Sequence, residues 1–208
     1  MPKHHATDAA IALRELNAEM LATDFPLARH ATQAVMGSGA APAHIMLLGE
    51  QPGEQEDLAG QPFIGPAGKL LDKALQEAGI ARAAVYVTNT LKHYKFKLQG
   101  TRRVHLVPGV GDIKIYLPWL QGEIEIVQPR VIVALGAVAA RALTGKTLSL
   151  EAHRGRLIPL TQDRQAVLTY HPSFLLHTPD KASKQLRYER LVADLALAAK
   201  TAAMPTSR

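Results

Sequence analysis

The stretch from residue 44 to residue 75 constrains the fold more than any other part of the sequence. It opens with the apolar run Ile45-Met46-Leu47-Leu48. A short apolar run bounded by turn residues is typical of a strand buried on both faces of a parallel sheet. The stretch closes at 66–75 with apolar residues on one helical face, and Pro66 suits the first turn of that helix. The pattern predicts a strand, a polar loop and a helix, which is the repeating unit of an α/β fold.

The same alternation continues along the chain. Further strands are expected at 85–88, 130–135, 154–159 and 166–170, and further helices at 10–21, 113–127, 137–143 and from 183 onwards. This order predicts an α/β three-layer sandwich with a central, mostly parallel sheet. At 208 residues the chain is expected to form a single domain, with about residues 1–9 and 202–208 flexible.

Composition narrows the possible partners and cofactors. The sequence contains no cysteine, which excludes disulfides, thiolate nucleophiles and cysteine-held metal clusters. The formal net charge is +6, so an anionic partner is expected, with nucleic acid as the first candidate. No apolar run is long enough to cross a bilayer. We therefore expect a cytoplasmic protein without a membrane partner.

Polar residues and a glycine follow several of the expected strands. Glu50 and Gln51 follow the first, Asn89 the second, Gly136 the third and His171 the last. Ligands of open α/β sheets bind at the carboxyl ends of the strands, so these residues are expected to meet at one edge. A lone histidine after a strand is more often structural, but this convergence favours a functional site.

The loop after the first strand allows two interpretations. It carries three carboxylates, Glu54, Glu56 and Asp57, which either belong to a binding site or are simply solvated. Phe63 lies in a setting rich in glycine and proline. An exposed ring is expected there, offering a flat surface to a planar ligand.

A long basic connection spans residues 90–111 and contains no acidic residue. It is expected to be an irregular loop, and irregular loops of this length are usually functional. Cations interleaved with aromatic rings favour phosphate contacts and base stacking, and a mobile solvated loop is the alternative. The residues in question include Lys95, Arg102, Arg103, Tyr94 and Phe96.

Several motifs together resemble a known family. Gly49-Glu-Gln-Pro-Gly53, the segment 58–68, Val87-Thr-Asn89 and His171-Pro-Ser173 resemble the uracil-DNA glycosylase superfamily, family 4 in particular. Thr101-Arg-Arg-Val-His105 resembles the histidine-bearing loop of the UdgX branch. The similarity covers roughly residues 15–200, and the motifs occur in the family's order.

The resemblance implies a role for each motif residue. The target nucleotide is flipped into a pocket, where Phe63 stacks on uracil and the Asn89 amide reads its edge. Main-chain groups near Gly49 and Gln51 contact the base, and His171 donates toward uracil O2. The residues expected to hold DNA phosphates are Ser173, Lys95, Arg102 and Arg103.

In the UdgX branch, the histidine that matches His105 attacks C1′ of the deoxyribose, so protein and DNA become covalently joined. Glu50 is expected to orient the His105 ring and to stabilise the sugar cation. The leading hypothesis is therefore a monomeric, self-crosslinking glycosylase that prefers uracil in single-stranded DNA. A turnover glycosylase that leaves an abasic site remains an alternative. So does a non-catalytic nucleic-acid-binding protein, in which His105 merely contacts phosphate.

One family feature is missing from the sequence. The resemblance implies a 4Fe–4S cluster whose ligands would fall at Ala22, Phe25 and Tyr116, with His93 as a remaining candidate. One histidine cannot hold a cluster, so we predict no iron, no other metal and no cofactor. Phe25 and Tyr116 are bulky and are expected to fill the vacated space by packing.

Overall fold

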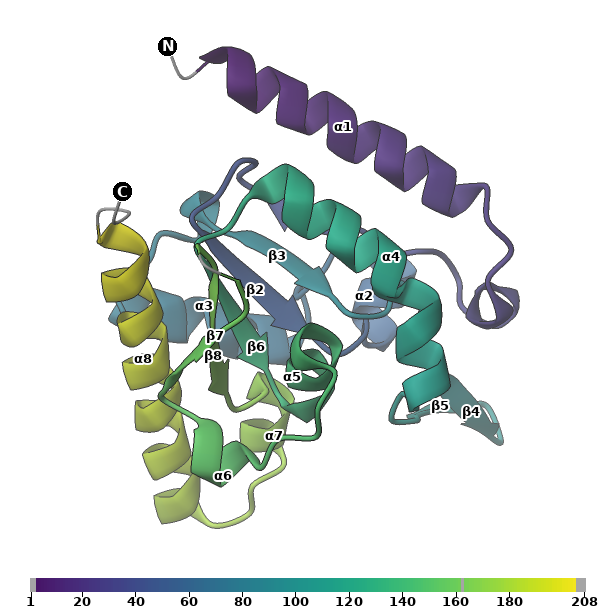
Figure 1. The fold of residues 1–208 in the computed structure, drawn as a ribbon. Helices are drawn as coiled ribbons and strands as arrows, with labels where there is room; N and C mark the ends of the chain where they lie inside the picture. Colours follow the sequence, from purple (N-terminus) through teal and green to yellow (C-terminus); the bar gives the residue numbers. More distant parts are fainter. Residues whose placement is uncertain (1–2, 162, 205–208) are drawn as a thin grey trace.

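The computed structural model describes residues 3–161 and 163–204. Within this part, a six-stranded sheet has the order β1-β3-β2-β6-β8-β7 (Figure 1). The four inner strands are parallel, and β1 and β7 are antiparallel at the two edges. The strands are β1 Ser38–Gly39, β2 Ile45–Gly49, β3 Tyr86–Asn89, β6 Val131–Leu135, β7 Leu157–Pro159 and β8 Gln165–Thr169.

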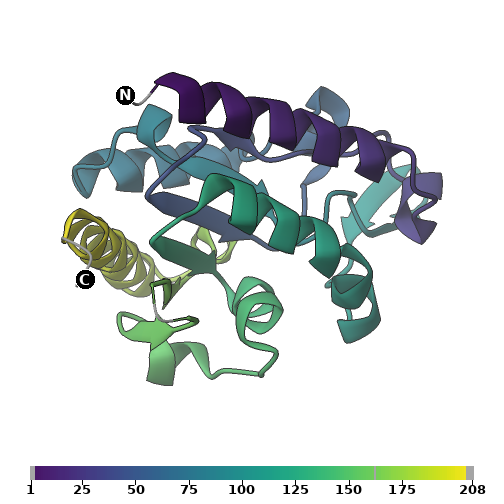
Figure 2. The ribbon, with the colours of Figure 1, turned by 45° about the horizontal axis from the view of Figure 1, so that its top comes forward.

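Helices cover both faces of this sheet (Figures 1 and 2). On one face lie α3 (Pro66–Glu77), α7 (Pro172–Leu176) and α8 (Lys181–Ala203). On the other face α1 (Lys3–Leu21) lies beside α4 (Val110–Val127), and α5 (Ala137–Thr144) packs against α4. The remaining helices are α2 (Glu54–Ala59), α6 (Leu150–His153) and the 3₁₀ turns Pro26–Arg29 and Arg82–Ala84. The expected three-layer α/β fold is confirmed.

The central strand explains why the fold needs two helical layers. Met46, Leu47 and Leu48 are all fully buried, yet consecutive side chains of a strand point to opposite faces. Leu47 packs in the core under α3 and α8, whereas Met46 and Leu48 pack under α4 and α5. A continuous apolar run therefore requires cover on both sides, as its pattern predicts.

Several segments differ from the sequence-based expectation: the strand expected at 154–159 begins only at Leu157, and β1, α6 and α7 were not expected. Residues 90–111 are not an irregular loop, because β4 (Phe96–Gln99) and β5 (Arg102–His105) pair as an antiparallel hairpin. Gly100 occupies the turn with φ +62°, which a glycine adopts without strain. The polar segment expected to be a loop forms the short helix α2.

The chain ends also differ in part. Helix α1 begins at Lys3 rather than near residue 10, so most of the segment expected to be flexible is helical. At the other end, α8 continues to Ala203. The rest of that expectation, for residues 1–2 and 205–208, lies outside the described residues. None of the described helices is both long enough and apolar enough to cross a membrane.

Aromatic rings occupy two of the three positions, Phe25 and Tyr116, where the resemblance would place cluster cysteines. The ring centroids of Phe25 and Tyr116 lie 4.6 Å apart in a stacked arrangement, and both side chains are buried. His93 Nδ1 lies 2.7 Å from the Tyr116 hydroxyl, and Trp119 meets Phe25 edge-on at 4.9 Å. The expected packing of Phe25 and Tyr116 is confirmed. These residues do not fit an iron–sulfur cluster, since they offer no thiolate and their rings fill the space between them.

This packing predicts a large loss of stability for Phe25→Ala. Removing a buried phenyl ring is expected to lower the free energy of unfolding by about 3–5 kcal/mol, because the site cannot fully collapse. Urea denaturation measures the change. Leu21→Ala is the control, since Leu21 is 66% exposed and its loss is expected to cost less than about 0.5 kcal/mol. Equal effects of the two substitutions would contradict the prediction.

Candidate active site

The carboxyl ends of β2, β3 and β8 surround a small cavity of about 120 Å³. A second cavity of about 400 Å³ adjoins it and shares Gln51, His105, His171 and Ser173 with it. Glu50 and Gly136 line this second cavity. The first cavity is lined by Gln51, Pro52, Gly53, Glu56, Phe63, Ala67, Asn89, His105, His171 and Ser173. The residues expected to meet at one edge of the sheet therefore do meet there.

Phe63 forms one wall of the small cavity in a strained conformation. Its φ is +57°, a region that bulky residues rarely adopt and that is often found at functional sites. The ring is buried rather than exposed, which corrects the expectation from the glycine- and proline-rich setting. Gly68 permits this conformation, since a Cβ at that position would lie 1.8 Å from the Phe63 carbonyl oxygen.

Gly49 brings Phe63 and Asn89 together. A Cβ on Gly49 would lie 2.3 Å from Asn89 Oδ1 and 2.5 Å from the Phe63 ring. Only a residue without a side chain allows the ring and the amide to share the cavity wall. The sequence-predicted residue Gly49 thus shapes the cavity through its missing side chain.

Two buried polar atoms in the cavity lack a hydrogen-bond partner within the described part of the chain. They are Asn89 Oδ1 and His171 Nε2, and both residues line the cavity. Leaving a buried polar group unpaired costs free energy, so such atoms in a native protein call for an explanation. A ligand with a complementary donor and acceptor would satisfy both atoms.

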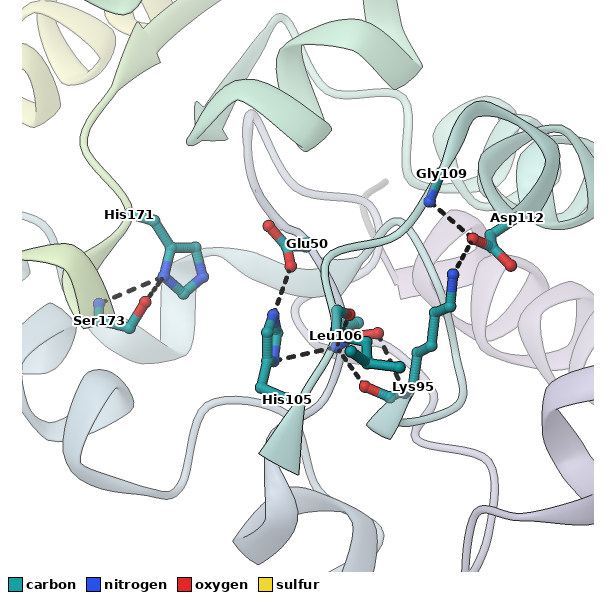
Figure 3. Close-up of polar contacts among 9 residues, drawn as sticks. Glu50, Lys95, His105, Leu106, Gly109, Asp112, His171 and Ser173 are labelled. Carbon is teal, nitrogen blue, oxygen red and sulfur yellow. Dashed lines mark hydrogen bonds and ion pairs between the residues drawn. The ribbon is translucent and has the colours of Figure 1, made fainter. Parts of the chain in front are cut away.

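His171 presents a donor to the cavity. Its Nδ1 accepts a hydrogen bond from the backbone N–H of Ser173 at 3.2 Å and lies 2.7 Å from the Ser173 hydroxyl (Figure 3). Because Nδ1 accepts, the proton of the neutral ring lies on Nε2. Burial lowers the pKa of His171 to about 4, although the nearby Glu50 carboxylate acts in the opposite direction. The ring is therefore a neutral N–H donor at neutral pH.

Two carboxylates of the segment after β2 accept backbone hydrogen bonds within the protein. Glu56 is buried and accepts hydrogen bonds from the backbone N–H groups of Gly53 at 3.1 Å and Gly65 at 2.7 Å. Asp57 is fully buried and accepts from the backbone of Thr32 at 3.0 Å. The interpretation of these charges as merely solvated is wrong for both. The position of Glu56 three residues after Gly53, in the first turn of a helix, is the capping signal that sequence reasoning missed.

The β4–β5 hairpin is attached to the sheet edge through the Gln51 side chain. Gln51 Oε1 accepts from the Lys95 N–H at 3.1 Å, and Nε2 donates to the carbonyl oxygens of Lys95 at 3.1 Å and Leu106 at 3.2 Å. These backbone contacts fix which end of the amide is which. The Gln51 side-chain amide is therefore hydrogen-bonded to the hairpin segment. Only the Gln51 backbone remains available for the expected contact with a base.

His105 ends the hairpin and is held on both sides of its ring. Its Nδ1 lies 3.0 Å from Gln51 Nε2, and its Nε2 lies 2.9 Å from Glu50 Oε1 (Figure 3). An amide nitrogen only donates, so Nδ1 must accept and the proton of the neutral ring lies on Nε2, facing Glu50. The Gln51 amide has two hydrogens for three acceptors, so these bonds are shared. The side chain of His105 is 48% exposed, which leaves the ring accessible from the cavity mouth.

Two of the expected phosphate ligands are engaged within the protein. Lys95 Nζ lies 2.7 Å from Asp112, and Arg103 lies 2.7 Å from the buried carboxylate of Asp57. The Arg103 guanidinium also covers the Phe96 ring at 4.8 Å. Arg102 is exposed on β5. None of these three residues lines either cavity, and only the backbone of Lys95 contacts another expected site residue, Gln51.

Comparison with known proteins identifies the family. The model of the Uracil DNA glycosylase superfamily matches residues 36–196, well over half of the chain. This chain belongs to the uracil-DNA glycosylase superfamily. The match confirms the family and the enzyme class, uracil-DNA glycosylase, that the motifs predict.

Curated relatives of this superfamily member align with it over most of their own length. A Type-4 uracil-DNA glycosylase of Thermotoga maritima is 36% identical over 168 residues, which cover 80% of this chain and 84% of the relative. A Type-4 uracil-DNA glycosylase of Pyrobaculum aerophilum is 34% identical over 163 residues, which cover 74% and 79% of the two chains. The alignments thus include most of both proteins.

The depressed pKa of His171 predicts that acid destabilises the fold. An unfolded histidine takes up its proton near pH 6.5, whereas the folded His171 does so only near pH 4. Between these values the unfolded state binds more protons, so the free energy of unfolding falls as the pH falls, by up to about 1.4 kcal/mol per pH unit. Urea denaturation between pH 7 and 4.5 should show a steeper loss for the wild type than for His171→Gln. Parallel pH profiles for the two proteins would contradict the assignment.

Proposed function

We propose that this protein excises uracil from DNA as a monomer and then captures the exposed deoxyribose through His105, as in the UdgX branch. The observation that carries the proposal is the position of His105, held between Glu50 and Gln51 at the mouth of the cavity. Excision rests on the family and on the cavity chemistry. Capture rests on the His105 geometry.

The cavity chemistry suits uracil. Phe63 offers a ring face to a planar base. Asn89 Oδ1 lacks a partner and can accept from the N3–H of uracil, while His171 Nε2–H can donate to O2. These contacts would satisfy both unpaired atoms of the cavity. Reaching them requires the nucleotide to leave the base stack.

Bond breaking places charge where the site can stabilise it. When the C1′–N1 bond breaks, its electron pair stays with uracil and negative charge spreads to O2. A fixed donor such as His171 Nε2–H in a buried cavity contributes about 3 kcal/mol to this stabilisation. The sugar becomes an oxocarbenium ion. The Glu50 carboxylate, which lies 2.9 Å from His105 Nε2, supplies negative charge that stabilises this cation.

Capture follows from the tautomer of His105. The Nε2–H faces Glu50, and the lone pair of a protonated ring nitrogen belongs to the aromatic ring, so Glu50 takes this proton and the N–H electron pair left on Nε2 forms the bond to C1′. The proton then neutralises the departing uracil anion. The net change replaces the C1′–N1 bond of the nucleotide with a C1′–Nε2 bond and releases neutral uracil. No water is consumed, which distinguishes this outcome from ordinary hydrolysis.

Single-stranded DNA is the preferred substrate in this proposal. Flipping a base out of a duplex costs a few kcal/mol, and a single strand avoids that cost. For phosphate contacts Arg102 is the best placed of the predicted residues, because it is exposed on the hairpin that carries His105. Lys95 and Arg103 would have to share charge with their acidic partners, and Ser173 already binds His171.

We also propose that the protein works without an iron–sulfur cluster. It has no cysteine, and the stacked rings of Phe25 and Tyr116 occupy the relevant positions. Metal analysis of the purified protein should find no stoichiometric iron. Iron bound in proportion to protein would contradict this part of the proposal.

The covalent step is tested by denaturing electrophoresis after mixing the protein with a uracil-containing oligonucleotide. The wild type is expected to give a slower band with single-stranded DNA and a weaker one with the matching duplex. His105→Ala is expected to give none, because the attacking nitrogen is gone. His44→Ala is the matched control, since His44 is exposed at the opposite end of β2.

The alternatives give different results in the same assay. Uracil release and alkali-labile DNA without a shifted band would indicate a turnover glycosylase. Salt-sensitive binding without uracil release would indicate a non-catalytic DNA-binding protein. A shifted band that persists in His105→Ala would also overturn the assignment of the nucleophile.

A further inference from the structure

A buried ion pair lies next to Asn89, which lines the cavity. Lys92 and Glu123 have side-chain exposures of 1% each, and Lys92 Nζ lies 2.6 Å from Glu123 Oε2. Lys92 belongs to the segment after β3, and Glu123 belongs to α4. A buried ion pair is weak evidence for stability, because removing two charges from water costs about as much as their attraction returns. A role other than simple stabilisation therefore has to be considered.

The Lys92 ammonium group is directed at the backbone of the uracil-reading residue. Besides Glu123, it donates to the Asn89 carbonyl oxygen at 2.7 Å and to Thr88 Oγ1 at 2.6 Å. A lysine has three N–H donors, so all of them are used. The side chain thus folds back onto the end of β3 and binds the residue whose amide lines the cavity.

Glu123 is held as firmly as Lys92. Its carboxylate accepts from the Tyr86 hydroxyl at 3.1 Å and from Thr88 Oγ1 at 3.0 Å, in addition to Lys92. Both of these partners lie on β3. Burial lowers the pKa of Lys92, and the Glu123 carboxylate acts in the opposite direction, which favours the charged form. The pair therefore connects α4 to the last residues of β3.

We propose that Lys92 and Glu123 are positioning residues that hold Asn89 in register with a uracil ring in the cavity. Asn89 also pairs with Gly49 in the sheet, and the turn after β3 adds hydrogen bonds from Thr90 N–H to the Gly49 carbonyl and from Leu91 N–H to the Glu50 carbonyl. Among the described residues Asn89 Oδ1 has no hydrogen-bond partner, so its position depends on its backbone. A charge-assisted bond to the Asn89 carbonyl restrains that backbone.

The inference rests on the proposed excision of uracil, and the test uses the double variant Lys92→Met/Glu123→Gln. Removing both charges avoids an unpaired buried charge, so the variant is expected to fold, which its melting curve verifies. We expect uracil excision, measured as the single-turnover rate of uracil release from single-stranded DNA with protein in excess, to fall at least tenfold. Affinity for the same DNA without uracil should change less than twofold. Backbone N–H exchange at Thr90 and Leu91 should be at least tenfold faster, with exchange in β6 unchanged.

Tyr86→Phe is the matched control, because it removes a bond to Glu123 without touching the contact between Lys92 and Asn89. It should keep excision within about twofold of the wild type. The inference is overturned if the double variant keeps wild-type excision, or if its exchange at Thr90 and Leu91 is unchanged. The rate of uracil excision by the wild type, measured first, tests the proposed function separately. The hydrogen-exchange experiment tests the restraint on Asn89 independently of that rate.

Discussion

The Gln51 side-chain amide is the contact on which the arrangement of the site depends. It binds the backbone of Lys95 and Leu106 as a neighbouring strand would, so it joins a hairpin remote in sequence to the end of the central strand. The same amide faces Nδ1 of His105 and leaves the ring proton on Nε2. One residue therefore sets both the place of the hairpin and the tautomer of its histidine, and Glu50, its neighbour in the chain, accepts a hydrogen bond from the Nε2–H of that ring.

The rest of the cavity follows from the parallel sheet. Because β2, β3 and β8 end at the same edge, Gly49, Asn89 and His171 meet without any long-range loop to guide them. Buried hydrogen bonds then fix the residues that line the cavity. Ser173 fixes the His171 ring, Glu56 connects the segments on either side of Phe63, and Lys92 binds the end of β3. Of the four buried side-chain atoms without a hydrogen-bond partner in the described part of the chain, Asn89 Oδ1 and His171 Nε2 belong to residues that line the cavity. This contrast between satisfied walls and unsatisfied lining is what a preorganised binding site requires.

The sequence predicts the sheet and its functional edge well because both depend on local patterns. The run at Ile45–Leu48 identifies a doubly covered strand, and residues that directly follow strands are placed by the strands themselves. The hairpin escaped prediction because β4 and β5 carry little apolar alternation and depend on Gln51, which lies more than 40 residues away. Phe63 was expected to be exposed, since neither its positive φ nor its contact with Gly68 is visible in composition. The partners of Asp57 were hidden for the same reason, because Thr32 and Arg103 are distant in sequence.

The central claim is that Gln51 and Glu50 together hold His105 as a neutral ring protonated on Nε2. Nitrogen-15 NMR of histidine-labelled protein at neutral pH tests this most directly, because protonated and unprotonated ring nitrogens have widely separated shifts. The His105 signals, assigned by their loss in His105→Ala, should show a protonated Nε2 coupled to its hydrogen and an unprotonated Nδ1. In Gln51→Leu this preference should weaken. A proton on Nδ1, or a doubly protonated ring, in the wild-type protein would contradict the account.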